Sequence, residues 1–385
     1  MIKKIDGKLG RFIQAMGRIP PLRRVGKAFL TFVQNSPTLQ THVVSRMVPR
    51  RKGNVEKLAL HEMESVLRRI AKSSRRIIVG PWLSEVGFEV LYWIPFLNWA
   101  VRHYNIDQSR LVVISRGGTA GWYRTIGGRY VDIFDHFLPD QFRDGNERRV
   151  EAAGGQKHRA VSDFDQQVID KVGQIMEWSS DGFDLLHPSV MYNFFTPYWR
   201  RKVPFTYLKA HFEPRRFEPQ ERNALPIDLP ADYVAAKFYF SACFPDNPAN
   251  RAFISSFLMR VAHGATVVLL SSGLKIDDHQ DWLPDLEKSG KLINLAGLMP
   301  PERNLEIQTA VVSRARQFIG TYGGFSYLAP LYGVPSVALY SEPQHFLPVH
   351  LEVAQEVFRS EGFGSFSAMN VRDLERLGML NGMHQ

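Results

Sequence analysis

Two adjacent glycines, Gly323 and Gly324, mark the segment of the sequence with the clearest chemistry. They follow an apolar run, residues 318–321, and precede residues 325–331, which suit a short helix. Paired glycines let the backbone come close to a ligand, and a helix that begins there directs unpaired N–H groups and its positive dipole end toward that ligand. The pattern predicts a phosphate-binding loop; the alternative is an ordinary tight turn in a parallel sheet. The other residues expected in this loop are Tyr322 and Ser326.

Two carboxylates, Glu85 and Glu89, stand four residues apart in a second loop. This loop follows a short strand, residues 76–79, and leads into a helix that we predict over residues 88–102. A carboxylate near the start of a helix is readily held in place and can take the proton from a hydroxyl group. Either residue is a candidate general base. The alternative is that it caps the helix or pairs with Arg116, which follows the next strand.

Basic and hydroxyl side chains follow the strands that we predict in the C-terminal half. Groups of this kind can hold an anionic ligand such as a phosphate, and an acid at the start of a helix can accept hydrogen bonds from hydroxyl groups. Each of them is also explained as a solvated or helix-starting side chain. The candidates are Lys237, Arg251, Ser272, Gly273 and Glu306.

Strands that alternate with helices must position these residues. In the C-terminal half we expect strands within residues 232–240, 265–273, 292–295 and 318–321, and helices over residues 250–262 and 304–315. Strands and helices at this spacing form βαβ units with a parallel sheet and right-handed crossovers. Ligands on such sheets bind at the carboxyl ends of the strands, where the candidate residues would lie.

A similar run over residues 76–121 precedes this one, so the sequence predicts an α/β fold with two Rossmann-like domains. The length of 385 residues is enough for two cores. A stretch rich in Pro and charge, residues 215–230, would join them. The expected parts are a basic helical extension (1–55), a first domain (56–225), a second domain (226–345) and a helical tail (346–385) that packs back across the first domain.

Residues 304–341 resemble the donor-binding half of nucleotide-sugar glycosyltransferases with the two-domain GT-B fold, and a looser likeness extends over roughly residues 75–345. In the lipopolysaccharide heptosyltransferases, the first βα loop carries a Gly-Asp pair, with a proline six residues after the acid. Here Glu89 keeps that spacing to Pro95, although Phe88 separates it from Gly87. The Asp of that family is its general base, so the resemblance implies this role for Glu89, with Glu85 as the competing carboxylate.

The resemblance also implies the roles of the domains and an activity. Residues 56–225 would form the acceptor-side domain and residues 226–345 the nucleotide-sugar-binding domain. The donor side would hold the diphosphate and the ribose through Lys237, Arg251, Ser272, Gly273 and Glu306. An inverting, metal-independent enzyme would move a sugar from a nucleotide-sugar donor to a glycan or lipid-linked acceptor in surface polysaccharide biosynthesis. The donor would be a substrate, and no cofactor is expected; Arg116 and Tyr192 are the candidates on the acceptor side. One alternative is a nucleotide-sugar epimerase of the same fold, which would turn over its donor without an acceptor. A non-catalytic polysaccharide-assembly protein is the other.

The sequence offers little to a metal ion. The cluster Asp277-Asp278-His279 with Asp281 invites comparison with an Asp-x-Asp manganese motif, but its acids are adjacent rather than alternating, so a solvated loop or a helix cap is favoured. An aromatic run beyond His187 can form a platform for a sugar ring, and a core or interdomain contact is the safer interpretation. The members of this run are Tyr192, Phe194, Phe195, Tyr198 and Trp199.

Composition and charge suggest a compartment and a partner. Cys243 is the single cysteine, so no internal disulfide is possible, and without a signal-peptide pattern we expect a cytoplasmic protein. Residues 1–52 hold twelve Lys or Arg and one acid, Asp6, and so carry +11 of a formal net charge of +10. Their interleaved apolar residues favour an anionic membrane surface on its inner face, or packing on the domain in the alternative. Nucleic-acid binding is not expected, because no recognised motif accompanies the charge.

Overall fold

The computed structural model describes residues 55–155, 157–178, 182–219, 225–274, 280–282 and 291–376. The chain divides into Met1–Val55 and Glu56–Gln385, and the fold below is that of the second unit. The basic segment 1–52, for which we predict membrane binding, lies outside the described residues. Among the described residues, none of the helices combines the length and the apolar character needed to cross a membrane.

The first sheet is parallel and built from short apolar strands. Its order is β3 (Arg129–Asp132), β2 (Leu111–Ser115), β1 (Arg76–Val79) and β4 (Phe183–Leu186). Because side chains alternate along a strand, Ile78 packs on one face of the sheet and Ile77 on the other. Both faces are therefore covered by helices, which explains why the strands are apolar throughout.

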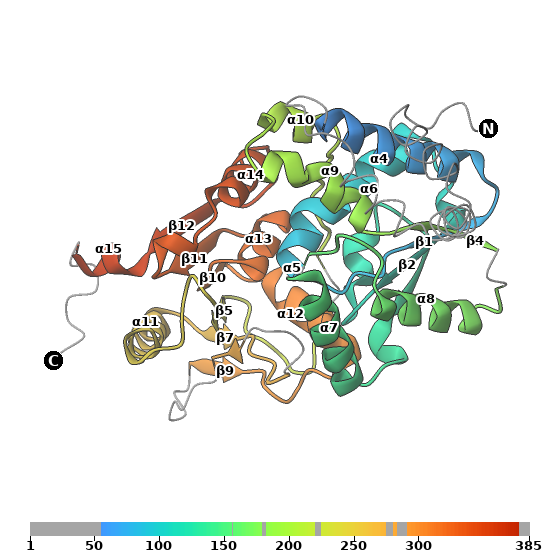
Figure 1. Ribbon diagram of the computed structural model, residues 1–385. Helices are drawn as coiled ribbons and strands as arrows, with labels where there is room; N and C mark the ends of the chain where they lie inside the picture. The colour runs from blue at the N-terminus through green and yellow to red at the C-terminus, as the bar shows by residue number, and fades with distance from the viewer. Residues whose placement is uncertain are drawn as a thin grey trace, which may run out of the picture. The chain divides into compact units, whose positions relative to one another are not determined.

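Helices from both sides of the first sheet complete this half (Figure 1). Residues of α7 (Pro139–Ala153) and α8 (Asp163–Ile175) pack with Ile78, whereas residues of α4 (Val55–Lys72), α6 (Ile94–His103) and α9 (Ser189–Trp199) pack with Ile77. The short elements are α5 (Val86–Phe88), η2 (Glu89–Trp93), η3 (Gln108–Arg110), η4 (Thr119–Tyr123), η5 (Ile133–Asp135) and α10 (Phe205–Lys209). The helix expected over residues 88–102 is thus interrupted by a π-helical turn, η2.

The second sheet is also parallel and has six strands. Its order is β12 (Phe366–Asn370), β11 (Ser336–Tyr340), β10 (Gln317–Thr321), β5 (Val234–Lys237), β7 (Val267–Leu269) and β9 (Leu292–Asn294). Gly320 of β10 pairs with Lys237 of β5, so the last residue of β5 lies beside the start of the glycine loop. A separate antiparallel pair joins β6 (Tyr239–Phe240) to β8 (Gln280–Asp281).

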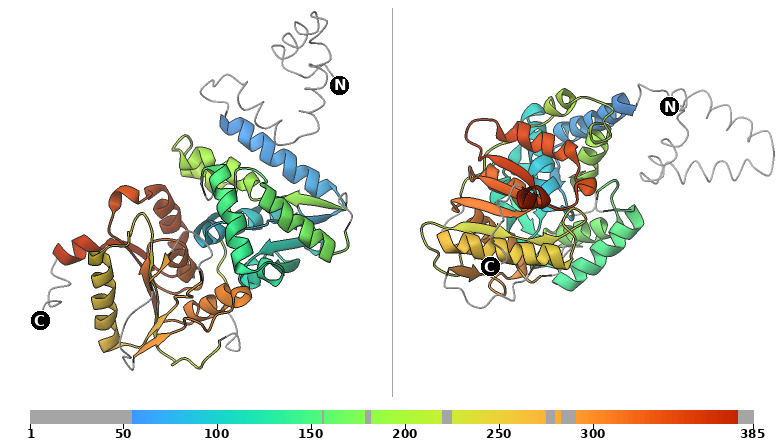
Figure 2. Two further views of the ribbon diagram at one scale, coloured as in Figure 1. Left: turned by 60° about the horizontal axis from the view of Figure 1, so that its bottom comes forward. Right: turned by 90° about the vertical axis from the view of Figure 1, so that its left-hand side faces the viewer.

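The helices of the second half also lie on both faces of their sheet, as the two views of Figure 2 show. Residues of α11 (Pro248–Gly264) and α15 (Val371–Arg376) cover one face, and residues of α12 (Asn304–Val312), α13 (Gly324–Leu331) and α14 (Pro348–Phe358) cover the other. Two short helices are η7 (Pro301–Arg303) and η8 (Pro343–His345). The predicted α/β class with two Rossmann-like domains is confirmed. The tail after residue 346 is not wholly helical, because β12 extends the second sheet.

Glycines allow the two halves to approach each other at α5 and α13, which lie side by side (Figure 1). A Cβ atom built on Gly324 would lie 2.8 Å from the backbone nitrogen of Gly87, closer than real Cβ contacts. A second contact places Gly117, which has a φ of +71°, against Leu305 of α12. The tail also reaches the first half, because Tyr92 and His350 of α14 are joined by a hydrogen bond of 2.7 Å. One apolar core therefore extends through both halves.

Candidate functional site

A cavity of about 510 Å³ lies where the carboxyl ends of the two sheets face each other. Residues after β1 and β2 supply one wall, and residues after β5, β7 and β10 supply the other. This is the position expected for a ligand on parallel sheets. The polar residues and glycines on the two walls include Glu85, Gly87, Arg116, Lys157, Lys237, Ser272, Asp281, Tyr322, Gly323 and Gly324.

Lys237 and Asp281 form the charged centre of the second-sheet wall. The Nζ atom of Lys237 lies 3.1 Å from an oxygen of Asp281, and it donates a hydrogen bond to the carbonyl of Leu270 at 3.2 Å. The backbone N–H of Ser272 donates to the same carboxylate at 2.8 Å. The predicted Lys237 and Ser272 are thus brought together at the cavity, and Asp281 compensates the charge of Lys237.

The glycine loop lies on the same wall, and its glycines have close protein neighbours. Gly323 has a φ of +149°, and a Cβ atom there would meet the hydroxyl of Tyr239 at 1.8 Å. Tyr322 lines the cavity, and its hydroxyl is joined to that of Tyr327 at 2.5 Å. Ser326 is fully buried and lies outside the cavity lining. Its hydroxyl accepts a hydrogen bond from the Gly323 N–H and donates one to the Gly323 carbonyl. Its contacts hold the start of α13.

Replacing Gly324 with valine is expected to weaken nucleotide binding and to destabilise the fold. The new side chain would overlap Gly87 and Val86, so the loss should reach about 1–3 kcal/mol, the usual cost of overpacking. Urea unfolding and calorimetry with nucleoside diphosphates would measure the two effects. Gly264→Ala is the matched control, because nothing lies within 4 Å of its Cβ position. Wild-type stability for Gly324→Val would contradict the close contact.

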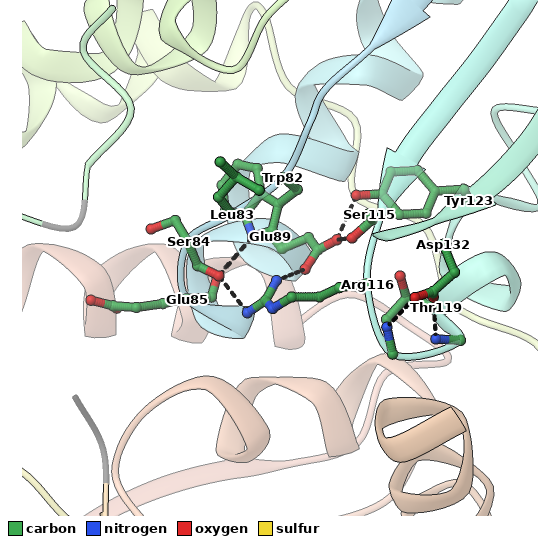
Figure 3. Close-up of polar contacts among 12 residues, drawn as sticks. Trp82, Leu83, Ser84, Glu85, Glu89, Ser115, Arg116, Thr119, Tyr123 and Asp132 are labelled. Carbon is green, nitrogen blue, oxygen red and sulfur yellow. Dashed lines mark hydrogen bonds and ion pairs between the residues drawn. The ribbon is translucent and has the colours of Figure 1, made fainter. Parts of the chain in front are cut away.

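Glu89 lies in the core of the first half instead of on the cavity wall. Its side chain is fully buried, and Ser115 and Tyr123 each donate a hydrogen bond of 2.6 Å to Oε1 (Figure 3). Burial raises the pKa of Glu89 to about 7, although the charge of Arg116 opposes this shift. A carboxyl group so enclosed has no contact with the cavity in this conformation. In this structure Glu89 is therefore placed to stabilise the core, and its carboxylate is not placed to accept a proton from a ligand in the cavity.

Arg116 lines the cavity and connects Glu89 to the loop after β1. Its Nη2 atom donates to the Ser84 carbonyl at 2.6 Å, and its Nη1 atom lies 3.7 Å from Oε2 of Glu89. Asp132 fixes the turn that follows Arg116 by accepting the N–H groups of Gly117 and Gly118. Arg116 is thus a support of the loop that carries Glu85.

Glu85 is the carboxylate of the pair that reaches the cavity. It is half-buried, lines the cavity, and extends away from Arg116 and Glu89 (Figure 3). It also precedes α5 directly, so the N–H groups of the first helical turn are nearby. Of the two predicted carboxylates, Glu85 has the geometry that a ligand hydroxyl could reach.

Other predicted residues lie away from the cavity lining. Arg251 is half-exposed and paired with Asp246, and Gly273 is exposed. Glu306 pairs with Arg303 and contacts the first half, where its N–H donates to the Gly117 carbonyl at 2.8 Å. These positions correct the donor-side expectation, because each residue makes a local or inter-sheet contact instead.

Tyr192 and its aromatic neighbours belong to the core. Tyr192 is 1% exposed and stacks on Trp82 and Phe88, with ring centroids 6.0 and 5.6 Å apart. Phe194 and Phe195 are fully buried as well. The core interpretation of this run is confirmed, and the acceptor role of Tyr192 has no support from its position.

Three residues of the site were not found from the sequence. Tyr239 supports the glycine loop by donating to the Tyr322 carbonyl, and Asp281 holds Lys237. Lys157 lines the cavity from the segment after α7, where its Nζ lies 5.4 Å from the ring centre of Phe88. The acidic cluster was the only sequence signal among these, and its residues 277–279 lie outside the described residues.

A buried cluster of His158, Asp165 and His187 stands behind the first-sheet wall. One oxygen of Asp165 lies 3.5 Å from Nδ1 of His158 and 3.3 Å from Nε2 of His187. Burial lowers the pKa of His158 to about 4. Burial alone would raise the pKa of Asp165, but hydrogen bonds from the two histidines hold it well below its usual range. The cluster is thus a carboxylate between two imidazoles.

The hydrogen bond at the second ring nitrogen of each histidine argues against a metal ion in this cluster. The second ring nitrogen of His158 accepts the N–H of Leu83 at 3.2 Å, and that of His187 accepts the N–H of Ser189 at 3.2 Å. Each ring therefore carries its proton on the nitrogen that faces Asp165. A metal ion would need a lone pair on the nitrogen that faces Asp165. Metal-bound histidines usually donate a hydrogen bond from their other ring nitrogen, whereas here that nitrogen accepts one. The arrangement fits a structural cluster that joins α8, the loop after β1 and the segment that contains Lys157.

No family model and no curated protein sequence matches the chain. Solved structures do match it. A glycosyl transferase of family 9 from Veillonella parvula has 15% identity and a TM-score of 0.41, with 80% of this chain and 89% of that chain covered.

Two further solved structures bear on the resemblance stated from the sequence. The E. coli ADP-heptose lipopolysaccharide heptosyltransferase II has 13% identity and a TM-score of 0.39, with 80% and 98% covered. A UDP-GlcNAc 2-epimerase from Methanocaldococcus jannaschii has 8% identity and a TM-score of 0.33, with 75% and 95% covered. The chain is thus similar to solved structures of glycosyltransferases, a heptosyltransferase among them, and of an epimerase. At TM-scores below 0.5 these likenesses decide nothing about its substrates, which depend on the residues of the cavity.

Proposed function

We propose that the chain is a glycosyltransferase that moves a sugar from a nucleotide-sugar donor to an acceptor hydroxyl. The observation that carries this proposal is the cavity between the carboxyl ends of two parallel sheets. One wall bears a carboxylate, Glu85, and the other bears a cation, Lys237, beside the glycine loop at the start of α13. A base and an anion-binding wall that face each other are the two requirements of this transfer.

The second-sheet wall would hold the diphosphate of the donor. Lys237 supplies a positive charge, and α13 begins at Gly324 with its unpaired N–H groups and positive dipole end. In the structure Asp281 compensates Lys237. A diphosphate would share the ammonium with Asp281 and would gain stabilisation as negative charge develops on the leaving group. The proposal needs no metal ion for this purpose, because the chain supplies the charge.

The first-sheet wall would hold the acceptor, with Glu85 as general base. In an inverting transfer the acceptor oxygen attacks the anomeric carbon from the side opposite the leaving nucleotide. The C–O bond to the acceptor forms, the bond to the diphosphate breaks, and the acceptor proton passes to the Glu85 carboxylate. Base and diphosphate must then lie on opposite sides of the sugar, which is how Glu85 and Lys237 are distributed on the cavity walls. Arg116 would position the loop of Glu85 through its bond to Ser84.

Surface polysaccharide assembly with a glycan or lipid-linked acceptor remains a proposal that rests on the basic segment 1–52. If this segment holds the enzyme on the inner face of an anionic membrane, its removal should sharply reduce sedimentation with anionic liposomes, and salt should weaken the binding of the full chain. Neutral liposomes are the control. Equal sedimentation of the truncated and the full chain would contradict the membrane role.

A thermal-shift panel of nucleotide sugars tests the proposed function. At least one of them should raise the melting temperature, because a ligand that binds the native state stabilises it. Lys237→Met should abolish that shift, and Lys291→Met is the matched control, since Lys291 is exposed and donates a hydrogen bond to the His263 carbonyl away from the cavity lining. Turnover of the donor without an acceptor would indicate an epimerase instead. Binding with no turnover under any acceptor would indicate an assembly protein.

A further inference from the structure

The mouth of the cavity on the first-sheet side is rich in positive charge. Lys157 lines the cavity, and its Nζ lies near the rings of both Phe88 and Trp199, 5.4 and 5.3 Å from their centres. Aromatic rings attract a cation but do not neutralise its charge, so the charge can still attract a ligand. Among the described residues, no carboxylate lies within 4.0 Å of this ammonium group.

Two further cations stand near Lys157. Burial lowers the pKa of the Lys157 ammonium, and the charges of Arg159 and Arg200 lower it further, whereas Glu85 raises it. Both arginines are exposed, and no described carboxylate forms an ion pair with either of them. Arg159 and Arg200 are thus close enough for their charges to act on the Lys157 ammonium, and Glu85 is the carboxylate whose charge stabilises it. Such an arrangement costs free energy unless an anion binds among them.

The buried carboxylates of the same wall have partners of their own: Asp165 faces His158 and His187, and Asp132 accepts the N–H groups of Gly117 and Gly118. Glu89 is the other carboxylate near Arg116, and its burial favours the neutral form, so Arg116 keeps part of its charge toward the cavity. The buried His350 beside Phe88 stays neutral, because burial lowers its pKa to about 3. The cavity wall near Glu85 presents the ammonium of Lys157, which an anionic group would use and a neutral sugar would not.

We propose that the acceptor carries an anionic group, a phosphate or a carboxylate, which Lys157 binds with Arg159 and Arg200 at the rim while Glu85 takes the proton of its hydroxyl. This inference rests on the proposed function for the identity of the acceptor, but the anion site itself depends only on these cations. Lys157 is then a residue that determines acceptor specificity. Lys237, on the opposite wall, serves the donor.

Calorimetry with the full chain tests this assignment with three probes: glucose 6-phosphate, glucuronate and glucose. We expect one of the two charged sugars to bind, at least tenfold more tightly than glucose, since a hydrogen bond to a charged group is worth about 1.5–3 kcal/mol. The charged sugar that binds distinguishes a phosphate from a carboxylate site. Raising the salt concentration should weaken this binding, because the site is partly exposed.

Matched variants separate the two walls. Lys157→Met should weaken binding of the charged sugar about tenfold and leave binding of glucose and of nucleoside diphosphates unchanged. Lys237→Met should do the reverse, and Lys291→Met should change neither. Arg200→Gln changes an exposed residue and provides a second measurement of charged-sugar binding if Lys157→Met is poorly folded. Saturating nucleoside diphosphate should not displace the charged sugar.

Three outcomes would overturn the assignment. Charged and neutral sugars could bind alike, neither charged sugar could bind at millimolar concentration, or the charged sugar could compete with nucleoside diphosphate and depend on Lys237. The last would assign the anion to the donor wall. Anion binding that depends on Lys157 in a chain that binds no nucleotide would leave the anion site standing and refute only the proposed function.

Discussion

Replacing Glu85 with glutamine is expected to lower turnover about a hundredfold or more, with little change in donor affinity. Glutamine keeps the size of the side chain and removes its capacity to take a proton. The expectation rests on position, because Glu85 lines the cavity on the wall opposite Lys237. Steady-state kinetics with the nucleotide sugar that the thermal-shift panel selects would measure the loss.

Glu89→Gln is the comparison that the structure demands. Glu89 accepts hydrogen bonds from Ser115 and Tyr123 and has no surface on the cavity. We expect its substitution to reduce turnover far less than that of Glu85. The reverse result would mean that Glu89, at its heptosyltransferase-like spacing to Pro95, is the base and that the loop of Glu85 moves to expose it. Full activity of both variants would place the base elsewhere.

Replacing Asp165 with asparagine should lower the free energy of unfolding by about 1.5–3 kcal/mol, the range for a hydrogen bond to a charged group, because the histidines and Ser162 lose the charge of their acceptor. The carboxylate holds two buried imidazoles through a single oxygen, and its other oxygen accepts the N–H and the hydroxyl of Ser162. Asp170→Asn is the matched control, because Asp170 lies exposed on the same helix. Urea unfolding at neutral pH would measure both variants.

The same cluster predicts a dependence of stability on pH. The pKa of His158 is about 4 in the fold against 6.5 in the unfolded chain, so its contribution is present above pH 6.5 and is lost as the pH falls toward 4. The contribution of Asp165 is lost below its unfolded pKa of 3.8. Asp165→Asn should remove the latter loss. If zinc ions raised the unfolding midpoint of the wild-type chain but not of Asp165→Asn, the cluster would be a metal site after all.

Glu89 acts in the opposite direction. Its pKa rises from 4.5 to about 7 on folding, so its contribution is complete below pH 4.5 and is lost as the pH rises through 7. Between pH 4.5 and 6.5 the gain from His158 and the loss from Glu89 oppose each other as the pH rises, so we expect a broad stability maximum at mildly acidic pH. The cause in both cases is burial of a group whose charged form prefers water.

Local patterns were sufficient to predict the strands, the glycine loop and Lys237. Each depends on neighbours in the chain: apolar runs of strand length, paired glycines, and a basic residue at the end of β5. Lys237 and Gly320 pair in neighbouring parallel strands, which is why the sequence could predict that Lys237 lies beside the glycine loop.

The acceptor wall could not be predicted in the same way, because burial there is set by segments far apart in the sequence. Glu85 and Glu89 are equivalent as sequence candidates, and only Ser115 and Tyr123, from the next βα unit, enclose Glu89. Lys157 reaches the cavity from a segment without helical or strand periodicity. Arg251 and Glu306 began helices as expected, yet they meet Asp246 and Arg303 instead of the cavity.

The contact of Gly87 with Gly324 has a consequence for the evolutionary history of the chain. Glycine is the smallest residue, so a larger residue at one of the two positions cannot be compensated by a smaller residue at the other. The two positions should therefore be inherited as a pair. Descendants that accept a larger residue at either should also show altered loops before α5 and α13, with the two halves farther apart and the cavity wider.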